Sequence, residues 1–417
     1  MISSRQERAK KMQLKQRYPS LSALKHLARQ GDTDERLEAV KLLKGSPFKG
    51  AVRTLIPLLA SENECVKSAS LAALIEIGER DTAELLSALG SRTWHVRAGT
   101  AKVLTRLADN HIPELVRRLD SSNRDVIYWV MKILVAARNR QGIEAVIACL
   151  EHHDPLVREY AADFLGHFRE KEVINPLIAA LFDTEWKVRS TAAQSLTSFG
   201  DEVVPAISCT VMGTAPGERY WLLKILEEVA DSRSLTALVN VLESPAPEER
   251  RLALSALRRL KEEGVIPALV RCLGDEVWAI RKESAETLME IGPEVTSALL
   301  PLLGHQNAHS RCWACKVFAE LGDSSVCGKV AKLLKDKEWY VRCAAAYSLG
   351  QLGSNDAVGP LLESLDDVSE EVRKSAVIAL GNLLDTRAVP ALEGALKDEN
   401  EWVRKYAEES LRKIWVA

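Results

Sequence analysis

The chain has 417 residues, of which 47% are hydrophobic and 27% charged, and its formal net charge is −2 at pH 7. This balance gives no general attraction to nucleic acid or to an anionic membrane. No run of about 18 apolar residues predicts a membrane span. Its eight cysteines lie mostly in helical pattern without disulfide-framework spacing, so we expect reduced thiols in a cytoplasmic protein.

The first segment, residues 1–20, reads MISSRQERAKKMQLKQRYPS and is basic, with six Lys or Arg residues and one Glu. It has no apolar stretch of the kind found in secretory signals. We interpret it as a solvated tail or a leading helix. The alternative is a basic arm that docks an acidic partner or RNA.

Residues 21–417 repeat with a fixed period. The clearest copy, residues 336–353, reads DKEWYVRCAAAYSLGQLG, and its Arg342 serves as an anchor position. Equivalent anchors recur every 30 or 31 residues, and all but Ile127 are basic. The anchors are Arg36, Lys67, Arg97, Ile127, Arg158, Arg189, Arg219, Arg250, Arg281, Arg311, Arg342, Arg373 and Arg404. Such a period predicts a stack of about thirteen repeats rather than a single globular core.

Each repeat is expected to contain two helices joined by a polar link. Apolar residues spaced three and four apart predict first helices over 357–365 and 387–396. A leucine seven residues after each anchor, replaced once by Phe318, predicts the buried face of a second helix of about 13 residues. Small residues three after the anchor allow close helix packing. Helix-capping Asp residues precede several anchors by six residues: Asp183, Asp275, Asp336, Asp367 and Asp398.

Other features refine this unit. The anchor arginines are expected to form a ladder of hydrogen bonds to the linking Asp or to carbonyl groups. Glycines expected to cap second helices are Gly78, Gly200, Gly292, Gly322 and Gly353. In the last repeat, Glu408 and Arg412 replace apolar or small residues on one helix face. Because terminal repeats need a polar outer face, we interpret this helix as a C-terminal cap.

The unit resembles the HEAT-like repeat of the phycobilisome-lyase (PBS-lyase) type, D-x-x-W-x-V-R-x-x-A-A-x-x-L-G. The matching residues are Asp336, Trp339, Val341, Arg342, Ala345, Ala346, Leu349 and Gly350. The resemblance implies an all-α fold, an α-α superhelix or solenoid of two-helix repeats in which the second helices line a concave face. It says little about function, because this fold is used for many tasks.

Aromatic residues show a longer period of 92 residues. The stretches YWVMK, YWLLK and CWACK each place a Trp two residues after the anchor and a Lys three residues later. One explanation is duplication of a three-repeat block, and the other is a row of side chains that faces a partner. On the second explanation, we expect the side chains of this row to project from the concave face: Trp129, Lys132, Tyr160, Trp221, Lys224, Trp313 and Lys316. Tryptophans in the linking turns are instead expected to cover the apolar layer: Trp94, Trp186, Trp278, Trp339 and Trp402.

No catalytic, cofactor or metal site is expected. The sequence contains no Gly-rich phosphate loop, GxSxG, HExxH or His-Glu dipeptide. Cys312 and Cys315 form a CxxC pair, but Cys315 occupies a packing position where other repeats hold Ala or Val. We therefore interpret these thiols, and the equivalent Cys343, as small buried residues rather than zinc ligands.

The leading hypothesis is a non-enzymatic scaffold that binds a protein or peptide along its concave face. The alternative, implied by the PBS-lyase resemblance alone, is a bilin lyase or another chromophore-handling enzyme. The third is nucleic-acid binding, which the mixed charge of the face disfavours, because Lys41, Lys102, Arg106 and Lys132 in early repeats give way to glutamates in later ones.

Overall fold

The computed structural model describes residues 20–168, 170–260 and 263–416. Within these residues the chain forms helices joined by short turns, with no β-strand. The helices group into two compact units, one ending at Val203 and the other beginning at Val204. The predicted basic segment lies outside the described residues except for Ser20, whose hydroxyl accepts the Ala23 N–H (3.2 Å) at the start of the first described helix.

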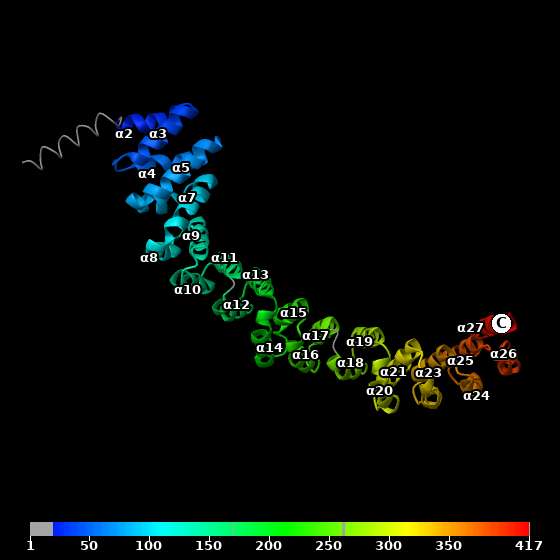
Figure 1. The fold of residues 1–417 in the computed structure, drawn as a ribbon. Coiled ribbons are helices and arrows are strands. Elements are labelled where there is room, and N and C mark those ends of the chain that lie inside the picture. The colour runs from blue at the N-terminus through cyan, green and yellow to red at the C-terminus, as the bar shows by residue number, and fades with distance from the viewer. Residues whose placement is uncertain (1–19, 169, 261–262, 417) are drawn as a thin grey trace, which may run out of the picture. The chain divides into compact units, whose positions relative to one another are not determined.

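Unit 1 contains pairs of a first and a second helix (Figure 1). Its first helices are α2 (Leu21–Gln30), α4 (Ala51–Leu55), α6 (Thr82–Ala88), α8 (Ile112–Arg117), α10 (Arg140–Ala148) and α12 (Ile174–Ala180). Its second helices are α3 (Thr33–Gly45), α5 (Glu64–Ile77), α7 (Trp94–Leu107), α9 (Arg124–Ala137), α11 (Pro155–Gly166) and α13 (Trp186–Thr197). Consecutive second helices pack side by side, and each also packs on the first helix of its own repeat.

Unit 2 has the same organisation. Its first helices are α14 (Val204–Gly213), α16 (Leu235–Val241), α18 (Ile266–Cys272), α20 (Thr296–Leu299), α22 (Cys327–Ala331), α24 (Val358–Glu363) and α26 (Val389–Ala395). Its second helices are α15 (Tyr220–Val229), α17 (Pro247–Leu260), α19 (Trp278–Ile291), α21 (Ala308–Leu321), α23 (Trp339–Leu352), α25 (Glu370–Leu383) and α27 (Glu401–Val416). The predicted all-α solenoid class is confirmed. We call the outward side of the second helices in each unit the second-helix face.

The first helices are shorter than the sequence predicts. The expected helix over 357–365 is observed as α24, flanked by the 3-10 turns η14 (Asn355–Ala357) and η15 (Ser364–Asp366). None of the described helices is both long and apolar enough to cross a membrane.

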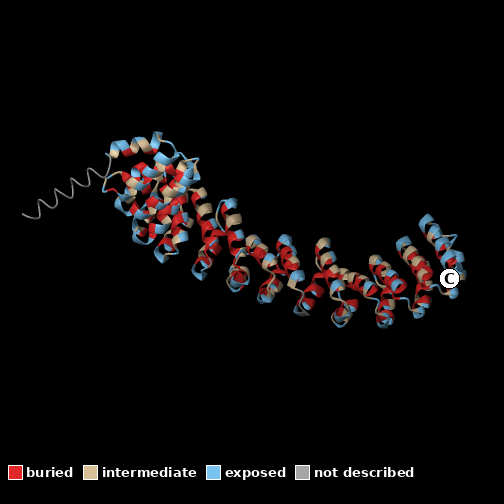
Figure 2. Ribbon diagram, turned by 45° about the horizontal axis from the view of Figure 1, so that its top comes forward, coloured by how far each residue is buried: buried red, intermediate tan, exposed pale blue. Residues whose placement is uncertain are grey.

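Buried residues lie between the helices of each unit, and exposed residues cover the outer faces and turns (Figure 2). Leu349 and Leu380, seven residues after their anchors, are fully buried, as is Phe318 at the one exceptional position. The small residues three after the anchor, such as Ala345 and Ala376, are fully buried as well. The periodic pattern therefore identified the core correctly.

The anchor arginines form the expected ladder, with one addition. Arg342 donates from NH1 to the Asp336 carbonyl (2.9 Å) in its own link, and from Nε and NH2 to the two carboxylate oxygens of Asp367 (2.7 and 2.8 Å). The carboxylate thus belongs to the next repeat, 25 residues on. We call each such bidentate pair a rung. The rungs are Arg158–Asp183, Arg250–Asp275, Arg311–Asp336, Arg342–Asp367 and Arg373–Asp398.

The linking aspartates are therefore not the helix N-caps. Asp336 accepts the Glu338 N–H at 2.9 Å, but Glu338 is the N-cap of α23, and its own side chain makes no capping bond. The Asp orders the turn before the helix and receives the arginine of the preceding repeat.

One glycine prediction is wrong, because α13 ends at Thr197 with Ser198 as its C-cap, and Gly200 begins the 3-10 turn η7 (Gly200–Val203). The other four glycines are C-caps of second helices. Gly292, Gly322 and Gly353 have positive φ, whereas Gly78 has φ −60° in the right-handed region. A Cβ at Gly78 would lie 2.9 Å from side-chain atoms of both Leu85 and Leu107. Close packing against these leucine methyl groups, rather than a left-handed backbone, therefore favours glycine at this position.

Candidate protein-binding surface

The stretches YWVMK, YWLLK and CWACK share the pattern Trp-x-x-Lys, and we call them the WxxK stretches. Their three tryptophans do not share one environment. Trp129 in α9 is only 5% exposed, so its predicted role as an exposed contact residue is wrong. The ring of Trp94, from the preceding second helix, approaches the Trp129 ring edge-on with centroids 6.2 Å apart. Trp221 and Trp313 in unit 2 are half-buried and keep part of their surface in solvent.

The lysines at this spacing interact within their own helices. Lys132 lies over the Trp129 ring, with Nζ 5.2 Å from the centroid, and Lys316 lies over Trp313 at 4.5 Å. Lys224 instead forms an ion pair with Glu227, with Nζ–Oε2 at 2.7 Å. Cation–π and charge pairing one helical turn apart therefore explain the repeated spacing without a partner.

The tryptophans of the linking turns are exposed, which contradicts their predicted role as covers of the apolar layer. Trp94, Trp186, Trp278, Trp339 and Trp402 are between 49% and 60% exposed. Each is the first or second residue of a second helix. In most of these repeats a different side chain, two residues after the tryptophan, closes the apolar layer. The buried residues one before the anchor are Val96, Val188, Ile280, Val341 and Val403.

Unit 1 contains a continuous group of aromatic rings across α7, α9 and α11. Tyr128 packs against Trp129, Tyr160 and Phe164, with ring centroids 5.1–5.4 Å apart, and Trp94 extends the group from α7. We call these five residues the aromatic cluster. Trp94 is exposed, and Tyr128 and Tyr160 are half-buried, so the cluster presents rings to solvent above a buried base. Sequence analysis identified Trp129 and Tyr160 but missed that Trp94 belongs with them.

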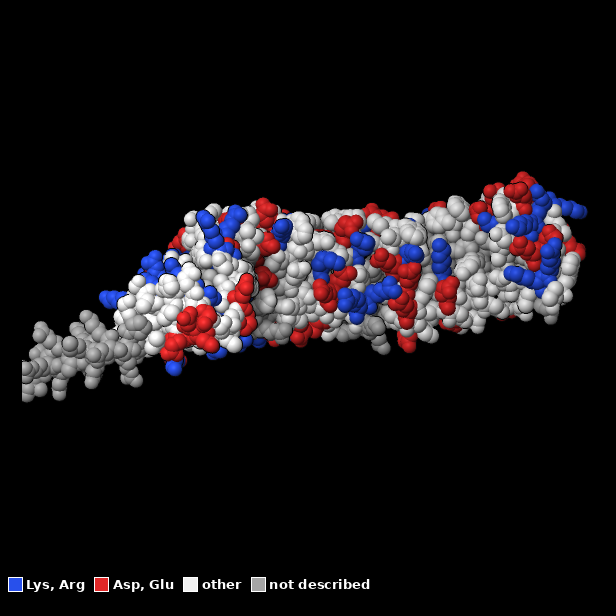
Figure 3. All heavy atoms as spheres, turned by 90° about the horizontal axis from the view of Figure 1, so that it is seen from above, with Lys and Arg blue, Asp and Glu red and all other residues white. Residues whose placement is uncertain are grey.

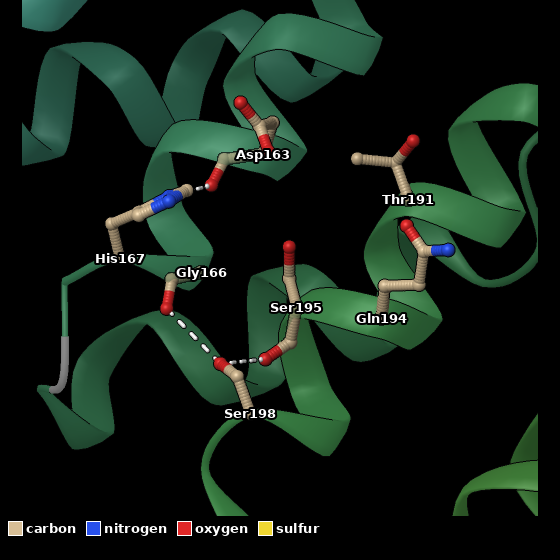
Figure 4. Close-up of a pocket in the computed structure, with 7 residues that line it drawn as sticks. All are labelled: Asp163, Gly166, His167, Thr191, Gln194, Ser195 and Ser198. Atoms are coloured by element: carbon tan, nitrogen blue, oxygen red, sulfur yellow. Dashed lines mark hydrogen bonds between the residues drawn. The ribbon is translucent and has the colours of Figure 1, made fainter.

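A polar cavity of about 310 Å³ lies between α11 and α13 (Figure 4). Its lining combines Asp163, His167, Ser195 and Ser198, the residue types of a catalytic triad. However, Ser195 Oγ donates to the Ala162 carbonyl at 2.8 Å. Among the residues that line this cavity, no hydrogen bond joins a serine hydroxyl to the imidazole, as nucleophile activation requires.

The other polar groups of this cavity also bond to the backbone. Ser198 Oγ donates to the Ser195 carbonyl at 2.6 Å, and His167 Nδ1 lies 2.8 Å from the Asp163 carbonyl, to which it donates. A Cβ on Gly166 would lie 2.3 Å from Ser195 Oγ. The cavity is therefore a place where two helices approach closely, and its hydroxyls satisfy helix carbonyls.

The CxxC thiols are buried in α21. Burial raises the pKa of the Cys312 and Cys315 thiols, so both remain protonated at neutral pH. Cys343 is half-buried, and burial raises the pKa of its thiol too. The described residues contain no group of three or more His, Cys, Asp or Glu side chains that could hold a metal ion.

Two-helix repeats stacked through rungs and small packing residues define an α-solenoid repeat protein. A family model described as HEAT repeats matches residues 21–105, 143–209, 235–308, 296–380 and 359–414. The chain belongs to the HEAT-repeat family.

Two curated relatives confirm the resemblance to HEAT repeats of the PBS-lyase type. The Bilin biosynthesis protein PecE of Mastigocladus laminosus is 27% identical over 208 residues, which span 46% of this chain and 77% of that protein. Phycocyanobilin lyase subunit alpha of a Nostoc species is 26% identical over 202 residues, or 45% of this chain and 65% of that protein. Among solved structures, importin beta shares 15% identity at a TM-score of 0.39, covering 95% of this chain and 61% of importin beta.

Proposed function

We propose that this chain is a non-enzymatic scaffold that binds a protein or peptide partner along its second-helix face. The aromatic cluster of unit 1 carries the proposal, because it presents partly exposed tyrosine and tryptophan rings on a rigid base. Such rings contribute most to protein binding when they are covered by a partner. Figure 3 shows basic and acidic side chains interspersed on the face that it views, and this mixture suits a polar protein surface.

Of the contact residues predicted from the sequence, Trp129 now supports the surface from beneath. Trp94 and Tyr128 join Lys132 and Tyr160 as the proposed contacts in unit 1. In unit 2 the half-buried residues of the WxxK stretches remain proposed contacts: Trp221, Lys224, Trp313 and Lys316.

Site-specific photocrosslinking tests the proposal. A photoreactive phenylalanine analogue placed at Trp94 should capture one or a few defined proteins when the full chain is expressed in its own cells. Trp186 is the matched control, because it also begins a second helix of unit 1 and is 60% exposed, against 58% for Trp94. Equal labelling patterns at the two positions, or no protein adduct at Trp94, would contradict a specific binding surface there.

The names of the relatives favour a second candidate, the handling of a bilin chromophore. PecE is a bilin biosynthesis protein and the Nostoc relative is a phycocyanobilin lyase subunit. The flat rings of the aromatic cluster could stack on such a chromophore. Titration of the full chain with phycocyanobilin should then shift the absorption band of the pigment, and Trp94→Ala should reduce the shift. An unchanged spectrum at saturating protein would remove this candidate.

A further inference from the structure

Three exposed cations lie on the second-helix face beside the aromatic cluster. Lys102 and Arg106 are one helical turn apart on α7, and Lys132 occupies on α9 the repeat position that Lys102 occupies on α7. Because α7 and α9 pack side by side, these residues form one basic patch. None of the three has an ion-pair partner among the described residues, although Lys132 also lies over two rings of the cluster.

This lack of partners contrasts with several other cations on second helices. Several exposed or half-exposed cations on these helices are neutralised by a glutamate: Lys44 by Glu76, Lys224 by Glu227, Lys282 by Glu286, and Arg258 by Glu290. A cation that is already paired gains little from a second carboxylate. The basic patch is therefore free to attract an anionic ligand.

Resting on the proposed function, we propose that the basic patch and the aromatic cluster bind an acidic peptide segment that carries an aromatic or large apolar side chain. The cations would bind its carboxylates, and the rings of Tyr128 and Tyr160 would receive its apolar side chain. Neighbouring helices lie about 8–10 Å apart. An extended peptide of about three residues therefore spans α7 to α9.

Carboxylates limit how far the basic patch extends. Glu159 and Asp163 lie on α11, the next second helix, so the positive surface ends after two helices. Asp125 on α9 faces Arg97, with an oxygen–nitrogen distance of 3.6 Å, and is neutralised. A nucleic-acid strand needs a longer, unbroken row of cations along its phosphates, so a short acidic peptide fits this surface better.

Fluorescence anisotropy with labelled peptides tests the proposal on the full chain. The first probe contains three acidic residues followed by Phe in a Gly/Ser frame, the second replaces Phe by Ser, and the third replaces the acidic residues by Lys. We expect binding in the order first, second, third, and weaker binding of the first peptide at higher salt. The double variant Lys102→Glu/Arg106→Glu should weaken binding of the first peptide about tenfold or more.

The matched control is Arg117→Glu/Arg118→Glu. It makes the same change in net charge at two exposed arginines on the first-helix side of unit 1. Equal losses in the two double variants would show a net-charge effect and overturn the site. Circular dichroism melting of each variant checks folding, and Lys102→Gln/Arg106→Gln replaces the charge reversal if that variant is unfolded.

Two other occupants are outcomes of the same experiment. Tighter binding of a labelled single-stranded oligonucleotide than of the first peptide would overturn the proposal in favour of nucleic acid. Self-association that Lys102→Glu/Arg106→Glu abolishes would identify a second copy of the chain as the occupant. If no peptide binds but photocrosslinking at Trp94 captures a protein, the acidic chemistry is wrong and the proposed scaffold function stands.

Discussion

The repeats of α21–α27 in unit 2 and those of α7–α11 in unit 1 use the same helix pair but differ in what holds neighbouring repeats together. In the first region every link has a rung, with Nε–Oδ2 distances of 2.7–2.8 Å. In the second, Arg97 donates to the Ser91 carbonyl of its own link at 2.7 Å, but across the link it has, among the described residues, only the 3.6 Å approach of its NH2 to an Asp125 oxygen. Ile127 replaces the next anchor and is buried.

Rungs are absent from other links of the described chain as well, since the guanidinium groups of Arg36 and Arg189 donate to backbone carbonyls, so α7–α11 is set apart by what accompanies the missing rungs. In α21–α27 the anchor arginines Arg311, Arg342 and Arg373 form bidentate ion pairs with the linking aspartates, and these side chains are mostly buried. In α7–α11 the missing rungs coincide with the aromatic cluster and the unpaired cations. Departures from a repeat pattern are expected where side chains serve recognition rather than stacking.

Breaking a rung should give the largest effect on stability. Arg342→Met leaves the Asp367 carboxylate, whose side chain is 11% exposed, without its bidentate partner. Loss of one partner from a fully buried ion pair costs about 3–5 kcal/mol of unfolding free energy, and because Arg342 and Asp367 are each partly accessible we expect a loss of about 3 kcal/mol or less. Urea unfolding followed by circular dichroism measures the loss, and hydrogen exchange should place it in α23 and α25.

The comparison substitution in unit 1 is Arg124→Met. Arg124 pairs with Asp154 at 2.5 Å, but its side chain is 61% exposed. We expect a smaller loss of stability than for Arg342→Met, because the Arg124 guanidinium is largely in solvent and exposed ion pairs contribute little. Equal losses for Arg124→Met and Arg342→Met would show that rungs do not set the two regions apart.

The next largest effect is expected from acid, which should lower the folding stability of the region that contains the rungs. Burial alone would raise the pKa of the Asp336 and Asp367 carboxyls, but hydrogen bonds from Arg311 and Arg342 and from backbone N–H groups hold both pKa values below the usual range. A carboxyl whose folded-state pKa is lowered stabilises the fold above its unfolded pKa of about 3.9, and the contribution is lost as pH falls through the folded value. Stability should therefore fall below about pH 4.

The variant Asp367→Asn isolates this contribution. It should be less stable than the wild type at pH 7 and should lose less further stability between pH 4 and pH 2. Asp366→Asn is the control, since Asp366 is exposed in the same turn. Urea midpoints measured at each pH would contradict the assignment if both variants followed the wild-type curve.

The repeat period alone predicted the fold, the buried leucines and the arginine ladder, because each depends on spacing within the chain. The burial of Trp129 was not predictable in this way, since it depends on a contact with Trp94 from the preceding repeat. Nor does the period show which first-turn residue closes the apolar layer, so the linking-turn tryptophans were wrongly predicted to cover it. The candidate surface was thus only partly visible in the sequence.

The smallest expected effect tests whether the two regions differ in their backbone as well. Arg138 follows α9 and Leu384 follows α25, each as the C-cap, and both have positive φ, 51° and 54°, at the repeat position where Gly353 has 72°. The left-handed conformation costs a non-glycine residue about 1 kcal/mol, so Arg138→Gly and Leu384→Gly should each stabilise the chain by up to about that amount. Because this cap geometry does not involve the rungs, the two gains should be equal. Thermal melting that shows a gain in only one region would mean that the helix ends, and not only the missing rungs, distinguish α7–α11 from α21–α27.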